Sequence, residues 1–148
     1  MRLMFDLDEC LVSTRRANEE AYASLGVVSP PISRHQPARF WMTDPDVYAR
    51  KHAVFPSFLA IHGKLLPSMN LLMPGSLILT GTSERSVQAI RKQFPVFESY
   101  TILPGLGPEE KLSIMRSTEP GVYFDDWPEF VQRVRRETRW QAIDVSGF

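Results

Sequence analysis

The stretch Leu3-Met4-Phe5-Asp6-Leu7-Asp8 decides the fold class, because a short apolar run ends directly in two acidic residues. A run of this length, bounded by polar residues, indicates a buried strand. Side chains two apart on an extended segment point the same way, so Asp6 and Asp8 should stand side by side just beyond the strand. In an open parallel sheet, ligands bind beyond the carboxyl ends of the strands. The sequence therefore places a candidate site here.

Three later apolar runs repeat this pattern, and helical patterns separate them. The runs are residues 77–79, 122–124 and 142–145, with a less regular candidate at 97–103. Helices are expected from a cap at Ser83 to residue 94, and after Pro108 and Pro128, since proline suits the first position of a helix. Strands that alternate with helices predict an α/β fold, a three-layer α/β/α sandwich around a central parallel sheet of the Rossmann-like kind.

The segment 14–72 interrupts this alternation. A helix over 15–25 is followed by a proline-containing loop and a second helix, which should begin at Asp44-Pro45 and be interrupted at Pro56. The prolines of the loop are Pro30, Pro31 and Pro37. We therefore expect residues 1–13 and 73–148 to form the core, and residues 14–72 to form a small, mainly helical, cap-like insertion.

Polar residues follow the other strands too. Thr80 and Gly81 come after the second strand, and Asp125 and Asp126 after the strand at 122–124. Carboxylates gathered at one edge of a sheet repel one another unless a cation joins them, and oxygen-only ligands suit Mg²⁺. A hydroxyl group, a backbone N–H and Lys111 could bind the remaining oxygens of a phosphate. The set is sufficient for phosphoryl transfer.

These motifs resemble those of the haloacid dehalogenase-like (HAD-like) hydrolases, in the same order and over nearly the whole chain. The matching stretches are Phe5-Asp6-Leu7-Asp8-Glu9-Cys10-Leu11, Leu77-Ile78-Leu79-Thr80-Gly81, Lys111 and Val122-Tyr123-Phe124-Asp125-Asp126. The sequence departs from the family pattern at Cys10, where the family usually has Thr or Val, and the insertion is shorter than many caps.

The resemblance implies a role for each of these residues. Asp6 would be the nucleophile that forms an aspartyl-phosphate, and Asp8 the general acid and base. Mg²⁺ would be held by Asp6, the backbone carbonyl of Asp8 and Asp126, with Asp125 supporting them or sharing the metal. The phosphate would be bound by Thr80, Gly81 and Lys111.

The predicted function is that of a Mg²⁺-dependent phosphomonoesterase acting on a small phosphorylated metabolite or a nucleotide. A first alternative is a 3′-phosphatase of nucleic-acid ends. The segment from Asp125-Asp126 to Gly147-Phe148 is similar to the end of polynucleotide kinase 3′-phosphatase domains, and it carries Arg133, Arg135, Arg136 and Trp140.

Two further alternatives remain open. The string Asp6-Leu7-Asp8-Glu9 also resembles the opening of RNA-polymerase-tail phosphatases, which would mean a phosphoprotein substrate. A non-catalytic binding module on the same fold is the last alternative, and the intact acidic set disfavours it.

Composition limits the remaining choices. The 148 residues include 17 basic and 17 acidic side chains, and this balance gives no support for broad nucleic-acid binding. A lone cysteine cannot form an internal disulfide, and no apolar run reaches membrane-spanning length. We expect a cytoplasmic protein without membrane segments.

Several polar residues have ordinary structural interpretations. Thr82 and Ser83 are expected to be helix caps, and Cys10 a small packed residue. The histidines His35, His52 and His62 show no metal-ligand spacing, so surface or insertion positions are expected for them.

Overall fold

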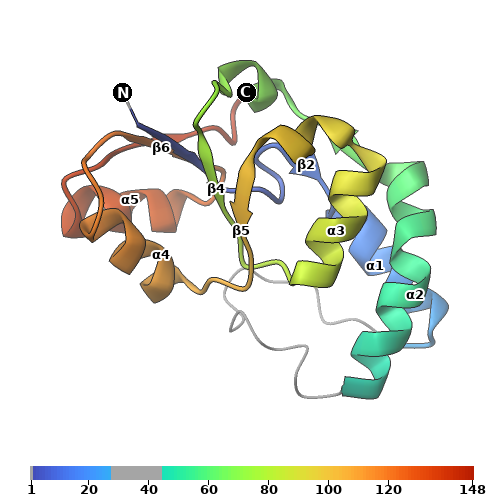
Figure 1. The fold of residues 1–148 in the computed structure, drawn as a ribbon. Coiled ribbons are helices and arrows are strands. Elements are labelled where there is room, and N and C mark those ends of the chain that lie inside the picture. The colour runs from blue at the N-terminus through green and yellow to red at the C-terminus, as the bar shows by residue number, and fades with distance from the viewer. Residues whose placement is uncertain (1, 28–44) are drawn as a thin grey trace.

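A five-stranded parallel sheet forms the centre of the computed structural model, which describes residues 2–27 and 45–148 (Figure 1). The strand order is β5-β4-β1-β6-β7. These strands are β1 (Leu3–Phe5), β4 (Leu77–Leu79), β5 (Thr101–Leu103), β6 (Val122–Asp125) and β7 (Gln141–Asp144). The first strand is the central one, and Phe5 pairs with Ile78 on one side and Phe124 on the other.

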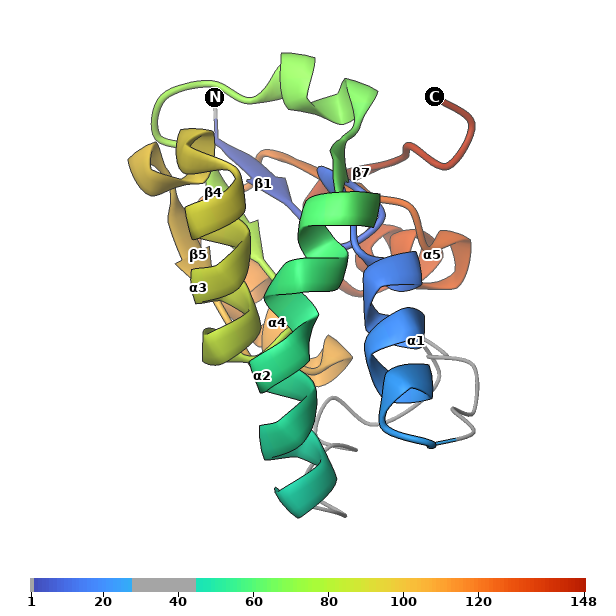
Figure 2. The ribbon, with the colours of Figure 1, turned by 90° about the vertical axis from the view of Figure 1, so that its right-hand side faces the viewer.

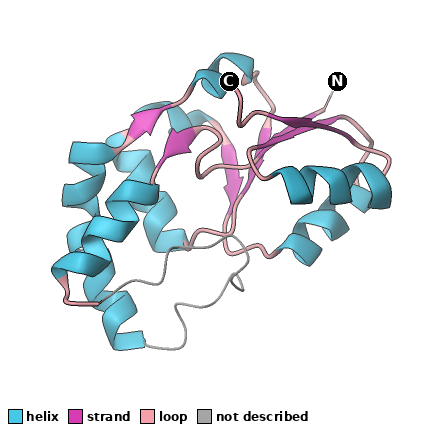
Figure 3. Ribbon diagram, turned by 180° about the vertical axis from the view of Figure 1, so that it is seen from behind, coloured by secondary structure: helices cyan, strands magenta, loops and turns pink. Residues whose placement is uncertain are grey.

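Helices cover both faces of the sheet, which confirms the predicted three-layer α/β/α sandwich (Figures 1 and 3). The helices are α1 (Arg15–Ser24), α2 (Pro45–His62), α3 (Glu84–Gln93), α4 (Pro108–Arg116) and α5 (Pro128–Glu137). One buried cluster joins Phe5 and Ile78 to side chains of α1, α2 and α3. A second cluster joins Met4 and Tyr123 to side chains of α4 and α5. Neighbouring residues on β1 therefore supply opposite faces of the sheet, as the period of a strand requires.

Local sequence signals set most helix starts as predicted. The Ser83 hydroxyl accepts a hydrogen bond from the Ser86 backbone N–H at 3.3 Å and caps α3. Pro108 and Pro128 occupy the first turns of α4 and α5. Three strands differ from expectation. A 3₁₀ helix over 95–99 takes up the start of the candidate run at 97–103, so that β5 covers only its end. β6 extends one residue further, to Asp125, and β7 lies one residue earlier than the expected 142–145.

The predicted interruption at Pro56 is wrong, because α2 runs from Pro45 to His62 without a break. Proline inside a helix costs about 3 kcal/mol. Phe55 and Leu59 lie on either side of Pro56, and both are fully buried in the cluster shared with the sheet. Burying two such side chains contributes about 3–6 kcal/mol, which is enough to hold the helix together.

The two helices α1 and α2 are brought together by a two-stranded antiparallel sheet that the sequence did not reveal. Its strands are β2 (Val12–Ser13) and β3 (Lys64–Leu65). Figure 2 shows α1 and α2 side by side, next to α3. The 3₁₀ helix Pro67–Leu71 then leads back towards β4. None of the helices in ranges 2–27 and 45–148 combines the length and apolarity that a bilayer crossing needs.

Some expectations fall on parts of the chain outside the described residues. These are the proline loop with Pro30, Pro31 and Pro37, the helix start at Asp44, and His35.

Candidate active site

Acidic side chains meet where β1 and β6 end at the same edge of the sheet. Asp6 directly follows β1, Asp125 is the last residue of β6, and Asp126 comes next. The Asp6 backbone N–H donates to the carbonyl of Phe124 at 2.9 Å, which extends the pairing of the two strands beyond β1. Carboxylate oxygens of Asp6, Asp125 and Asp126 all lie within 4.8 Å of one another. The structure thus brings together three side chains that the sequence placed at one site.

Lys111 reaches this acidic group from α4. Its Nζ lies 2.9 Å from Asp6 Oδ1, and the residue is only 8% exposed. Burial by itself lowers the pKa of Lys111, but the negative charges of Asp6 and Asp125 outweigh it and leave the pKa raised. Burial raises the pKa of Asp6 to about 7, with the charge of Asp125 adding to the rise and Lys111 opposing it. One ammonium is therefore too little positive charge for this site.

Asp125 is held in place by two hydrogen bonds. The Tyr123 hydroxyl donates to Asp125 Oδ2 at 2.6 Å, and the Trp127 backbone N–H donates to Oδ1 at 3.0 Å. Each carboxylate oxygen has a second lone pair, so both can still face a cation. Burial raises the pKa of Tyr123 well above its usual value, so this hydroxyl remains a donor.

The acidic group fits a hard divalent cation. Three carboxylates and one lysine leave a deficit of two positive charges, and every donor atom is an oxygen. The raised pKa of Asp6 has the same physical origin, since a carboxylate in this position lacks a sufficient counter-charge. Asp6, Asp125 and Asp126 are the residues that could hold the ion.

Asp8 stands beside this group and is surrounded by hydroxyl groups. Thr14 donates to Asp8 Oδ1 at 2.6 Å, and Thr80 and Thr82 donate to Oδ2 at 2.9 and 2.6 Å. The expectation that Thr82 is a helix cap is wrong, because its hydroxyl binds Asp8 and Ser83 caps the helix. Asp8 therefore ties Thr14, just before α1, to the turn after β4.

Glu9 fixes the position of Thr14 at the start of α1. Neither residue was among those predicted to form the site. Glu9 Oε1 accepts hydrogen bonds from the backbone N–H groups of Thr14 and Arg15 at 3.0 and 2.7 Å, at the start of α1. Glu9 has φ of 60°, a conformation that is uncommon for a residue other than glycine. These two hydrogen bonds offset its cost. The sequence signal for this contact is a glutamate five residues before the threonine that precedes a predicted helix.

The turn from Thr80 to Thr82 is braced by the loop before α4. The Leu106 backbone N–H donates to the carbonyl of Thr80 at 2.9 Å, and that of Gly105 donates to the carbonyl of Thr82 at 2.8 Å. A Cβ atom at Gly81 would lie 3.3 Å from the carbonyl oxygen of Leu106. Glycine thus lets these two segments approach closely beside Asp8.

Two buried residues of α2 also approach this region. His52 is 7% exposed, so it is not at the surface, and it lies on α2 within the segment 14–72, the other position expected for it. Its Nε2 lies 3.4 Å from the Ser83 hydroxyl, and its ring packs edge-on against Tyr48. Burial, together with the charges of Lys51 and Arg85, lowers the pKa of His52 to about 4. Lys51, its neighbour, is 6% exposed. The third histidine, His62, is half-buried beside Glu20.

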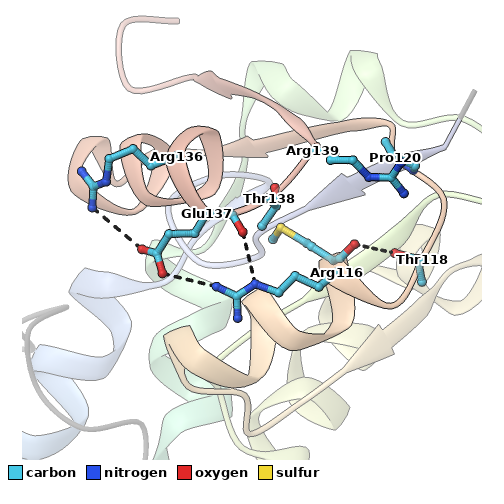
Figure 4. A pocket seen from close by; sticks show the side chains of 8 residues that line it. Arg116, Thr118, Pro120, Arg136, Glu137, Thr138 and Arg139 are labelled. Carbon is cyan, nitrogen blue, oxygen red and sulfur yellow. Dashed lines mark hydrogen bonds and ion pairs between the residues drawn. The ribbon is translucent and has the colours of Figure 1, made fainter.

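A separate cavity of about 270 Å³ lies away from these residues (Figure 4). It is lined by the ends of α4 and α5 and by Pro120 and Arg139, which precede β6 and β7. It therefore opens at the amino ends of the strands, opposite the acidic group. Arg116 and Arg136 in its wall both pair with Glu137, at 3.3 and 3.8 Å. With Arg139 the wall carries three arginines and one glutamate, but the cavity lies at the opposite edge of the sheet and is not part of the acidic site.

The sequence significantly matches no protein-family model and no curated protein. Several solved structures are nevertheless similar. A candidate phosphoglycolate phosphatase from Lactobacillus plantarum is 14% identical, with a TM-score of 0.64 over 95% of this chain and 84% of its own. CbbY from Rhodobacter sphaeroides, solved in complex with phosphate, is 20% identical, with a TM-score of 0.63 over 97% of this chain and 85% of its own. A HAD-like family hydrolase from Streptococcus pneumoniae is 18% identical, with a TM-score of 0.61 over 97% of this chain and 83% of its own. At these identities the likeness establishes the fold.

Proposed function

Because the chain has the fold of HAD-like hydrolases, we propose that it is a Mg²⁺-dependent phosphatase of small phosphorylated molecules. The observation that carries the proposal is the cluster of Asp6, Asp125 and Asp126 with the Lys111 ammonium 2.9 Å from Asp6. The fold alone hosts several chemistries, so the activity is argued from this site.

Asp6 is the proposed nucleophile. One of its carboxylate oxygens attacks phosphorus, the bond from phosphorus to the leaving oxygen breaks, and Asp8 gives a proton to that oxygen. Water then attacks the aspartyl-phosphate while Asp8 takes a proton from it, which releases inorganic phosphate and restores Asp6. Asp8 is suited to this double role because three hydroxyl groups fix its carboxylate.

The other predicted residues stabilise the phosphoryl group in this proposal. Thr80, the Gly81 backbone and Lys111 bind its oxygens, where negative charge must be held during transfer. Mg²⁺, when held by Asp6, Asp126 and the Asp8 carbonyl with Asp125 beside them, offsets the charge between nucleophile and phosphate. CbbY, with the same fold, was solved in complex with phosphate, which supports a phosphate site here.

We further propose that residues 14–72 serve as a short cap over this site. Thr14, at the start of this segment, is hydrogen-bonded to Asp8, and α2 places two buried residues close to the turn after β4. A cap that closes one side of the site favours a small substrate over a polymer.

The arrangement of the C-terminal arginines argues against the nucleic-acid alternative. Arg133 pairs with Glu109 and Glu137 at 2.6 and 2.8 Å, and Arg135 donates to the carbonyl of Ala142. The Trp140 indole is buried and donates to the carbonyl of Met115. Side chains engaged within the protein are poorly placed to contact phosphates or to stack on bases, so a small molecule is the substrate we propose.

Hydrolysis of p-nitrophenyl phosphate tests the proposal. We expect turnover with Mg²⁺, none with a chelator in excess, and a loss of at least about 10⁴-fold in Asp6→Asn, because the nucleophile is removed. Asp46→Asn, an exposed acidic position on α2, is the matched control and should retain full activity. A folded wild-type protein without turnover would favour the binding module, and turnover unchanged in Asp6→Asn would exclude the mechanism.

A further inference from the structure

Lys51 is a buried cation whose nearest partners among the described residues are uncharged. It is 6% exposed and lies on α2. Its Nζ is 4.6 Å from the centre of the Phe55 ring, 5.7 Å from that of Tyr22 and 3.4 Å from the Ser86 hydroxyl. No carboxylate of the described ranges 2–27 and 45–148 lies within 4 Å of this ammonium.

These contacts do not account for the energetic cost of burying the charge. Removing an ammonium from water costs several kcal/mol even after relaxation. A cation over an aromatic ring and one long hydrogen bond to a neutral hydroxyl each recover only part of that cost. Fully buried lysines are rare unless they are paired. The site is therefore incomplete as it stands, and an anion would complete it.

The ammonium lies at the edge of the candidate active site. Ser86, its hydrogen-bond partner, is in the first turn of α3, directly after the turn Thr80–Thr82 that binds Asp8. The negative charge of Asp8 acts on Lys51, although burial has the larger effect and lowers the pKa of Lys51 to about 8. The lysine thus remains mostly charged at neutral pH. The short contacts of Asp8 are with three hydroxyl groups, and no ion pair within 4 Å joins it to Lys51.

We propose that Lys51 selects substrates that carry a second anionic group, a carboxylate or another phosphate, beyond the phosphoryl group that is transferred. This inference rests on the proposed function, because it takes the transferred group to lie among Asp6, Thr80 and Lys111. Lys51 approaches from the opposite face of the sheet, from α2, whereas Lys111 comes from α4. A substrate held between them presents one anionic group to each lysine.

Matched substrate pairs test the inference through activity. Phosphoglycolate and hydroxyethyl phosphate differ only by a carboxylate in place of a hydroxymethyl group, and ethylene glycol bisphosphate supplies a second phosphate. We expect kcat/KM to favour at least one of the two probes with a second anionic group over hydroxyethyl phosphate by about tenfold or more, since hydrogen bonds between charged groups are the strong ones. In Lys51→Met this preference should fall to within about twofold, while p-nitrophenyl phosphate, which lacks the second group, is hydrolysed as in the wild type. A preference for phosphoglycolate would identify the second group as a carboxylate, and a preference for ethylene glycol bisphosphate would identify it as a phosphate.

Controls separate selection from a structural role. Lys51→Arg keeps the charge and should retain part of the preference, and Lys92→Met removes an exposed lysine of α3 and should change nothing. The inference would be overturned if the wild type showed the same kcat/KM for hydroxyethyl phosphate as for both probes with a second anionic group. A Lys51→Met variant that loses activity on all substrates in the same proportion would also overturn it.

A binding measurement keeps the inference testable without turnover. Phosphonoacetate and hydroxyethylphosphonate form a pair that cannot be hydrolysed at an ester bond, and calorimetry with Mg²⁺ gives their affinities. We expect tighter binding of phosphonoacetate to the wild type, lost in Lys51→Met. If only the proposed function is wrong, no ester is hydrolysed, but the wild type still binds phosphonoacetate more tightly than hydroxyethylphosphonate. Equal binding of both phosphonates by the wild type and by Lys51→Met would overturn the role of Lys51 alone.

Discussion

Two buried lysines face the site from opposite sides of the sheet, and their pKa values move in opposite directions. Lys111 and Lys51 are similarly buried, at 8% and 6% exposed. The pKa of Lys111 is raised, because the charges of Asp6 and Asp125 outweigh its burial. The pKa of Lys51 falls to about 8, because burial outweighs the charge of Asp8 and the nearest described groups are a hydroxyl and two aromatic rings. The comparison teaches that, at similar burial, the charged partner decides the direction in which the pKa of a lysine moves.

The two lysines also differ in whether the protein itself supplies a counter-charge. Lys111 has its counter-charge within the protein, so its position is set before any ligand arrives. Lys51 carries a desolvation cost that the protein only partly offsets. Replacing each lysine by methionine, which has similar length and no charge, should therefore have opposite effects on stability.

The largest effect is expected for Lys111→Met. Removing one partner of a buried ion pair leaves Asp6 uncompensated, so the free energy of unfolding should fall by about 3–5 kcal/mol. Loss of a positive charge on the phosphoryl oxygens should lower kcat by about 10²–10³-fold. Urea denaturation and the p-nitrophenyl phosphate assay measure the two effects. The comparison between the two lysines fails if stability is unchanged.

A smaller effect, of a few kcal/mol, is expected from pH in the metal-free protein. The unfolded chain releases the Asp6 proton near pH 3.8, whereas burial and then the charge of Asp125 hold the folded pKa at about 7. Between these values the folded state binds more protons, so the free energy of unfolding should fall as pH rises from about 4 to 7, and level off above.

Denaturation curves with a chelator, compared between wild type and Asp6→Asn, measure this slope. The two should differ between pH 4 and 7, and parallel curves would contradict the raised pKa. Excess Mg²⁺ should stabilise the wild type increasingly as pH rises, because the cation binds the deprotonated carboxylate.

For Lys51→Met we expect unchanged or higher stability, by up to about 2 kcal/mol, since an imperfectly compensated charge is replaced by an apolar side chain of similar shape. Thermal and urea unfolding measure the change against Lys92→Met, which should lie within about 0.5 kcal/mol of the wild type. A loss as large as that of Lys111→Met would mean that Lys51 has a strong partner in the folded protein.

The smallest expected effect is the coupling between Lys51 and Ser86. Ser86→Ala should cost about 1 kcal/mol in the wild type and less in a Lys51→Met background, because the 3.4 Å hydrogen bond is then already absent. A double-mutant cycle gives the coupling energy, which we expect near 0.5 kcal/mol. Strictly additive changes would show that this contact carries no energy.

The sequence was sufficient to predict the strands and helices whose signals lie in neighbouring residues. β1 and β4 are short apolar runs, α3 has a serine cap, and α4 and α5 begin at prolines. The parallel sheet followed because strands and helices alternate, and this order brings strand ends together. Gathering of Asp6, Asp125 and Asp126 could therefore be predicted without coordinates.

The features that the sequence did not reveal depend on packing between distant segments. The pair β2–β3 joins two-residue strands separated by some fifty positions, and neither is long enough to show a period. α2 continues through Pro56 because Phe55 and Leu59 are buried against the sheet. This burial cannot be read from the residues around Pro56 alone. Lys51 and Thr82 gain their significance from neighbours far along the chain.

The central place of β1 has a consequence for how the molecule is made. Both neighbours of β1 come much later in the chain, since Phe5 pairs with Ile78 and Phe124. During synthesis, β1 must therefore wait for β4 to cover one edge and for β6 to cover the other, and parallel pairing over such spans is slow. A nascent chain halted before residue 122 would expose an apolar strand with an open edge, which is a template for self-association. The residue proposed as the nucleophile is thus translated well before the acidic residues of β6 that surround it.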